Sequence, residues 1–96
     1  SDGDVNTAQT RFSTAAEAGN PVAMFSLAQF FDGQDAPDLV GAYAWSSLAI
    51  VRGLNEAVAF RDALEARMTP ADVLAGQAQA RGWTEAKLAD VADGEQ

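Results

Sequence analysis

The chain contains no cysteine and no histidine, and Lys87 is the only lysine among its 96 residues. Disulfides, the usual tetrahedral zinc sites and every acid–base arrangement built on cysteine or histidine are therefore excluded. Ser46 and Ser47 lie in a helical stretch with no histidine to act as their base, so neither is expected to be a nucleophile. We expect no metal site, no cofactor and no enzymatic activity.

Positive charge is also scarce. Six lysines and arginines oppose fourteen aspartates and glutamates, which gives a net charge of -8. Phosphate backbones and anionic membrane surfaces repel such a protein, so we expect no nucleic-acid partner. A basic protein or peptide would be attracted, although the charge can also serve solubility alone.

No apolar run is long enough to cross a membrane. The longest, "VGAYAWSSLAIV" at residues 40–51, contains glycine and serine and is too short for about 30 Å of hydrocarbon. We therefore expect a soluble protein with no membrane insertion. The sequence begins with serine rather than methionine, so a cytoplasmic location and a periplasmic or secreted one after signal removal both stay open.

The chain does contain clear signals for where helices start and end. Apolar residues recur every three or four positions without strand-like alternation. Capping residues followed by proline or an acid mark helix starts, and glycines mark helix ends. These signals predict an all-α fold of about six helices in a single domain, residues 1–96, with helices over about residues 4–18, 21–31, 38–52, 55–67, 70–81 and 84–92.

Two glycines and two asparagines give the clearest boundaries. Gly19 and Gly53 are placed to take the left-handed conformation that closes a helix. Asn20 is expected to cap the next helix, with Pro21 at its first position, and Asn55 is expected to cap the fourth.

The C-terminal third is predicted to form two helices. "TPAD", residues 69–72, has the pattern of a capping box and predicts a helix start. Gly82 is expected to end that helix, with Trp83 folded back on the preceding turn.

The third helix, over residues 38–52, is apolar nearly all round. A helix of this kind is packed by neighbours on more than one side. We therefore expect it at the centre of the fold.

Similar residues return 34 positions along the chain. A period of this length with two helices per unit is typical of an α-solenoid, in which each helix pair stacks on the next. The matching pairs are Ala8 with Ala42, Ser13 with Ser47, Ala15 with Ala49, Gly19 with Gly53 and Ala23 with Ala57.

A family pattern runs through residues 15–57, carried by Gly19, Ala23, Leu27, Phe31, Gly33, Asp38, Ala42, Trp45 and Ala49, and it restarts at Gly53 and Ala57. In this pattern the chain resembles a Sel1-like repeat, a relative of the tetratricopeptide repeat, which is the competing identification. It departs from the pattern at Ala28, where glycine is usual, at Phe31, where tyrosine is usual, and at Arg61, where leucine is expected.

The resemblance implies a short right-handed α-solenoid of antiparallel helix pairs. Residues 4–18 would form a leading helix and residues 20–53 one full repeat. Residues 54–68 would be a degenerate repeat helix. Residues 69–92 would form C-terminal capping helices that shield the last apolar face.

Two acidic patterns favour solvated surface over chemistry. "DGQDAPD", residues 32–38, has aspartates at three-residue spacing, whereas a calcium-binding EF-hand needs acids at alternate positions and a closing glutamate. Asp62 and Glu65 lie one helical turn apart, and an acid–base role for them is the alternative to simple solvation.

In tetratricopeptide-type geometry, the first helix of each pair lines a concave surface. The resemblance thus implies a shallow groove with an acidic edge, lined by Phe25, Gln29, Asp32, Glu56, Ala59 and Ala63. Trp83 is expected either to seal the C-terminal end or to contact a partner.

The leading hypothesis is a protein-interaction module, an adaptor or accessory subunit that binds a peptide or helix of a partner protein. The alternative is a structural segment of a larger solenoid or complex with no groove ligand of its own. A third hypothesis, processing of a small ligand as suggested for some Sel1-like members, is opposed by the absence of cysteine. A homodimer through the Trp83 end is a further expectation.

Overall fold

Residues 14–94 are described in a computed structural model, with side chains described for residues 14–86. Every regular element among them is a helix, beginning with a helical turn at residues 14–17. The others are α2 (Pro21–Asp32), α3 (Leu39–Val51), α4 (Ala57–Glu65) and α5 (Pro70–Gly94). The all-α prediction is therefore confirmed, and the rest of the helix predicted over residues 4–18 lies outside the described residues.

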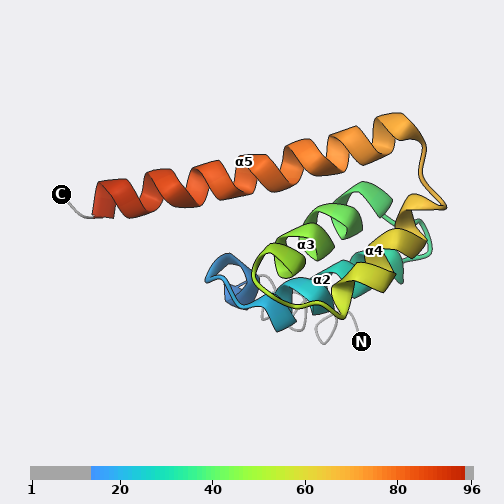
Figure 1. Cartoon of the computed structure of the whole chain (residues 1–96), viewed down its shortest axis with the longest axis horizontal. Coiled ribbons are helices and arrows are strands. Elements are labelled where there is room, and N and C mark those ends of the chain that lie inside the picture. Colours follow the sequence, from blue (N-terminus) through green and yellow to red (C-terminus); the bar gives the residue numbers. More distant parts are fainter. Residues whose placement is uncertain (1–13, 95–96) are drawn as a thin grey trace.

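The third helix lies at the centre of the fold, as its all-round apolar character predicts. α3 packs against α2, α4 and α5. Figure 1 shows α2 and α4 on one side of α3 and α5 on the other. The extensive contacts of α5 are with α3 alone, so α4 and α5 are joined by a short turn without forming a closely packed pair.

The core is built around the α2–α3 pair from small and medium side chains. Met24 and Leu27 of α2 are buried together with Leu48 and Ala49 of α3. A second cluster joins α3 to α4, where Tyr43 and Leu64 are buried with Val73 of α5 packed against them. α3 thus contributes to both clusters, which explains why the chain places its most continuous apolar stretch there.

Three helix starts have the caps that the sequence predicts. The Asn20 side chain accepts hydrogen bonds from the backbone N–H groups of Val22 (2.9 Å) and Ala23 (3.2 Å). Thr69 and Asp72 form a reciprocal capping box, in which each backbone N–H donates to the other side chain. Asp38, at the predicted start of α3, accepts from the backbone N–H of Gly41 at 2.9 Å.

The two glycines 34 positions apart close their helices in the same way. Gly19 has φ of 98° and Gly53 has φ of 99°. At each turn the glycine N–H donates to the carbonyl three residues earlier, and the next N–H donates to the carbonyl five residues earlier. This pair of bonds defines a Schellman motif, so the sequence recurrence is matched by a structural one.

The predicted break at Gly82 is wrong, because α5 runs unbroken from Pro70 to Gly94. Gly82 does not have a positive φ, and a Cβ placed there would meet nothing within 4 Å. Trp83 does not fold back on its own helix but packs on Trp45 of α3. A tertiary contact thus keeps the helix continuous where local signals favour an end, and the two predicted capping helices are one.

The fourth helix is also shorter than predicted, at Ala57–Glu65 instead of 55–67. Asn55 does not cap it; the N-cap position is Glu56, and its side chain makes no capping hydrogen bond. Instead the N–H groups of Ala57 and Val58 donate to carbonyls three residues earlier. These tighter 3₁₀-type bonds satisfy donors that a cap would otherwise serve.

α5 approaches α3 closely at one glycine. A Cβ added to Gly76 would lie 2.5 Å from Cδ1 of Tyr43 and 3.2 Å from its Cβ. Tyr43 is itself fixed, because its hydroxyl donates to Oε1 of Glu65 (3.1 Å) on α4 and lies 3.5 Å from Nε2 of Gln77. Only glycine permits this approach, which positions the first half of α5.

Within the described part of the chain, no helix has the length and apolar character needed to cross a membrane.

Candidate functional site

The groove predicted from tetratricopeptide-type geometry corresponds to the side of α2 that faces α4. Phe25 of α2 packs edge-on against Phe60 of α4, with ring centroids 5.4 Å apart and an interplanar angle of 82°. Phe25 is half-buried and belongs to the packing around the main core. Its ring therefore joins two helices of this chain, and Gln29, one turn further along α2, is exposed.

Asp32, the predicted acidic edge of that groove, has a partner. Its Oδ1 accepts a hydrogen bond from Nη1 of Arg67 at 2.6 Å in an ion pair. The side chains are 25% and 48% exposed respectively, so water screens the pair and its contribution to stability is small. The pair joins the C-terminal end of α2 to the segment after α4 and reduces the negative charge at this edge.

The remaining predicted groove residues lie on α4 or at its start. Glu56, Ala59 and Ala63 are all exposed. Ala59 and Ala63 are four residues apart and so share one face of the helix. They present little area, so any binding on this side would rest on Gln29, Glu56 and the edge of Phe25.

Trp83 holds α5 against the body of the protein. Its ring lies 6.0 Å from that of Trp45 at 67°, an edge-to-face arrangement. The guanidinium carbon of Arg52 is 6.0 Å from the Trp83 ring centroid, within the range of a cation–π interaction. Half-buried Trp83 thus packs at the junction of α3 and α5, while contact of its exposed part with a partner stays a prediction.

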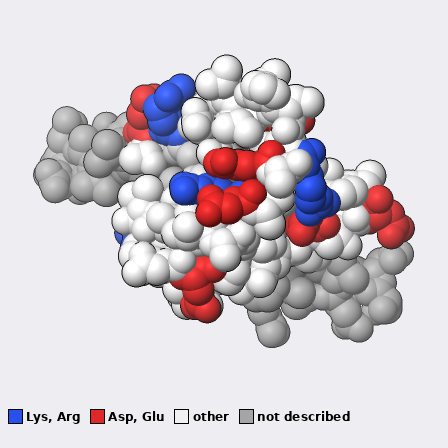
Figure 2. Space-filling model, turned by 45° about the vertical axis from the view of Figure 1, so that its right-hand side comes forward, with Lys and Arg blue, Asp and Glu red and all other residues white. Residues whose placement is uncertain are grey.

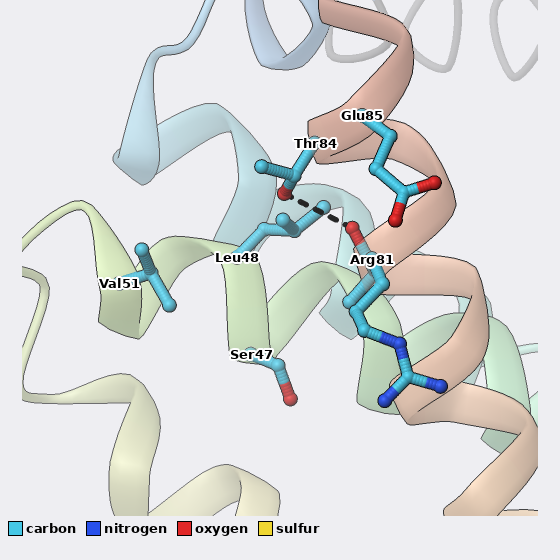
Figure 3. Close-up of a pocket in the computed structure, with 7 residues that line it drawn as sticks. Ser47, Leu48, Val51, Arg81, Thr84 and Glu85 are labelled. Atoms are coloured by element: carbon cyan, nitrogen blue, oxygen red, sulfur yellow. Dashed lines mark hydrogen bonds between the residues drawn. The ribbon is translucent and has the colours of Figure 1, made fainter. Parts of the chain in front are cut away.

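A groove that the sequence does not predict lies between α3 and α5. Its volume is about 370 Å³, and it is lined by Ser47, Leu48 and Val51 of α3 and by Ala80, Arg81, Thr84 and Glu85 of α5. In Figure 3, Leu48 of α3 and Thr84 of α5 lie close together between the two helices, and Glu85 projects from α5 away from α3. Ala80 is the smallest residue of the α5 wall and leaves room for the groove.

The groove is mainly apolar and open to solvent. Val51 at its edge is 82% exposed, the highest value among the large exposed hydrophobic side chains, with Leu74 of α5 at 65%. The hydroxyl of Thr84 donates to the carbonyl of Ala80 at 3.1 Å, which leaves its methyl group as the surface offered to a ligand. A spacing of four residues, at Ser47 and Val51 and again at Ala80 and Thr84, is the sequence signal that places these residues on facing sides.

Charge is confined to one wall of this groove. Arg81 and Glu85 both come from α5 and are exposed. Neither forms an ion pair with another residue among those whose side chains are described. Figure 2 shows that on the viewed face some acidic side chains lie beside basic ones and others stand alone, with uncharged surface between them.

The residues considered for catalysis have structural partners. The hydroxyl of Ser46, which is fully buried, donates to the carbonyl of Tyr43 at 2.9 Å. Glu65, the second member of the acidic pair with Asp62, accepts from the Tyr43 hydroxyl. Among residues 14–86, no three acidic side chains are grouped so as to hold a metal ion. The groove between α3 and α5 can therefore bind a ligand through its shape and through apolar contacts.

Comparison with known proteins adds no assignment: no family model matches the chain, and neither a curated protein nor a solved structure does.

Proposed function

We propose that this chain is a non-enzymatic protein-interaction module that binds a helix of a partner chain in the groove between α3 and α5. The observation that carries the proposal is the exposed apolar groove of about 370 Å³ with Val51 82% exposed at its edge. Large apolar side chains left in water beside a concave surface are typical of interaction sites.

The shape of the groove favours a helix as the ligand. It runs between two helices, and a helix laid into such a groove presents apolar residues at three- and four-residue spacing to both walls. Each 100 Å² of apolar surface removed from water contributes about 2.5 kcal/mol before the costs of association. Val51 at the edge and Ala80 in the α5 wall supply that surface, since Leu48 is already buried.

Charge defines the ligand further. Glu85 would pair with a basic residue on the bound helix, and Arg81 would pair with an acidic one, at matching positions along the groove. The expected ligand is thus a helix that carries apolar residues together with charges of both signs.

Membership of the Sel1-like group is part of the proposal. It is supported by the two Schellman turns at Gly19 and Gly53, which repeat with the period of the sequence pattern. The binding surface proposed here nevertheless differs from the surface that this group's geometry implies, on the side of α2 that faces α4.

The test compares tagged wild-type protein with Val51→Asp and Val22→Asp in a pull-down from the source cell. Val22 on α2 is a matched control, because it is 60% exposed and lies away from the groove. We expect one partner that is retained by wild type and Val22→Asp and lost by Val51→Asp. Titration of that purified partner should then show a Kd weakened at least tenfold by Val51→Asp.

Two further variants test the predicted surface beside α4. If Phe25→Ala or Gln29→Arg removes the partner from a folded protein while Val51→Asp does not, the binding site is on α2 and the groove assignment is wrong. Circular dichroism of each variant establishes that the helices are intact. A partner that no surface variant affects would contradict both locations.

A structural role in a larger complex is the second candidate. Figure 1 shows the C-terminal half of α5 running past the end of α3, so that part of the helix offers a surface for joining a neighbouring unit. This role predicts that replacing residues of the groove leaves assembly unchanged. Shortening α5 after Glu85 should instead abolish assembly, which size-exclusion chromatography of the complex measures.

A further inference from the structure

We infer that the helix bound in the α3/α5 groove is α5 of a second copy of this chain, in an antiparallel arrangement that brings Arg81 of each copy opposite Glu85 of the other. This inference rests on the proposed function, since it names the helix that the groove accepts. Three observations lead to it: the projection of α5, the spacing of its two charges, and the exposed apolar residues beside them.

α5 is much longer than its support. It has 25 residues, whereas α3, the helix on which it packs, has 13. Val51, near the end of α3, lies with Thr84 and Glu85 at the groove, so the part of α5 beyond Glu85 continues past α3. A single helix surrounded by water is marginal, and packing along one side is what normally stabilises it.

An antiparallel second copy would supply that packing over almost the whole helix. Residue 82 is the midpoint of α5, which spans Pro70–Gly94, and residue 83 is the midpoint between Arg81 and Glu85. Pairing two copies about residue 83 therefore lays the projecting end of each α5 beside the supported half of the other. The overlap covers residues 72–94 of both copies, about six helical turns.

The charges fit this arrangement and no parallel one in the same register. In the antiparallel pair, Arg81 faces Glu85 of the second copy, and Glu85 faces its Arg81, which gives two equivalent contacts about one two-fold axis. A parallel pair in register would place Arg81 beside Arg81 and Glu85 beside Glu85. Neither residue has an ion-pair partner within the described part of its own chain.

The apolar residues beside the groove complete the surface. Leu74, Arg81 and Glu85 are spaced by seven and four residues and so lie on one face of α5. Leu74 is 65% exposed, and Val51 stands across the groove on α3 at 82%. A second α5 in the groove would cover Val51 and Leu74 in both copies, so one contact would bury four large apolar side chains.

The experiment is sedimentation velocity of the whole chain across a concentration series, with charge-reversal variants. Wild type is expected to be a monomer–dimer equilibrium. Arg81→Glu and Glu85→Arg each turn two attractive contacts into two repulsive ones, and we expect each to weaken dimerisation about tenfold. The double variant R81E/E85R restores opposite charges at every contact and should recover wild-type association.

Mixing the two single variants gives the sharpest result. An R81E chain carries acids at both positions and an E85R chain carries bases at both, so each repels its own copies and attracts the other. With one variant fluorescently labelled, the mixture should form a heterodimer at least ten times tighter than either homodimer. Asp62→Arg, which changes net charge as Glu85→Arg does but lies on α4, is the control and should dimerise at least as well as wild type.

A wild type that stays monomeric up to millimolar concentration would overturn this inference, as would a dimer that is indifferent to all the charge reversals. These outcomes are separable from failure of the proposed function. A monomeric chain that retains a Val51-dependent partner leaves the groove as an interaction site for another protein. A monomeric chain with no Val51-dependent partner removes both.

Discussion

The α2/α4 side and the α3/α5 side of this molecule are each bridged by side chains from two helices, but between α3 and α5 a groove is left beside the contact of Trp45 with Trp83. Phe25 packs against Phe60 of α4, and Asp32 pairs with Arg67 in the segment after α4, so α2 is held at two places on this side. Between α3 and α5 the facing residues near Ala80 are too small or too polar to close the gap, and a groove is left. The repeat pattern of the sequence therefore predicts which residues face a given side of the fold. The size of their side chains determines whether a groove is left on that side.

The largest expected effect is the loss of the close approach that positions α5. Gly76→Val would force the new side chain into Tyr43, which is held by Glu65 and cannot move freely. We expect a loss of about 3 kcal/mol in the free energy of unfolding, at the upper end of overpacking costs. Chemical denaturation followed by tryptophan fluorescence measures it, because Trp45 and Trp83 meet where α5 docks.

Gly82→Ala is the matched control for that change. Gly82 lies in the same helix, and nothing is within 4 Å of a Cβ built on it. Replacing a helical glycine with alanine in open space should stabilise by about 0.5–1 kcal/mol. Destabilisation by both variants to the same degree would contradict the assignment of the close approach to Gly76 alone.

The next effect separates packing residues from groove residues. Phe25→Ala should lower the free energy of unfolding by about 2 kcal/mol, roughly half the cost of truncating a fully buried phenylalanine. Val51→Ala, at the edge of the open groove, should change it by less than about 0.5 kcal/mol. Thermal unfolding of both variants tests the contrast, and equal losses would show that Val51 is covered in the isolated chain.

A smaller effect concerns the two helix-ending glycines. Gly53→Ala should cost about 1 kcal/mol, because an L residue at positive φ is strained even though nothing crowds this position. Gly19→Ala should cost only slightly more, because its Cβ would also lie 2.9 Å from Nη1 of Arg52, the flexible end of a side chain that can shift. Urea denaturation of the two variants measures the difference, and a Gly53→Ala protein as stable as wild type would rule out the strain.

Whether a feature could be predicted from the sequence depends on how far apart in the chain the residues that determine it lie. The caps at Asn20 and Thr69 and the turns at Gly19 and Gly53 depend on neighbours within five residues, and the structure has all four. The central position of α3 followed from its all-round apolar sequence. These features need no knowledge of distant residues, which is why local reasoning finds them.

The features that escaped prediction all depend on residues far apart in the chain. Gly82 has the local pattern of a helix end, but the contact between Trp83 and Trp45 keeps α5 continuous through it. The groove is lined by residues of α3 and α5 that lie far apart in the chain. The contacts of Phe25 with Phe60 and of Asp32 with Arg67 escape prediction for the same reason.

The smallest expected effect tests how firmly the α2/α4 side is closed. In a double-mutant cycle of Asp32→Asn and Arg67→Gln, we expect a coupling free energy of about 0.2–1 kcal/mol at low salt, as for other exposed ion pairs. The coupling should fall as salt is raised, because both side chains are open to water and their interaction is screened. A coupling that is unchanged in high salt would show that the pair is more protected than its exposure indicates. The side predicted to be a groove would then be the more rigidly closed of the two, which would strengthen the case for binding between α3 and α5.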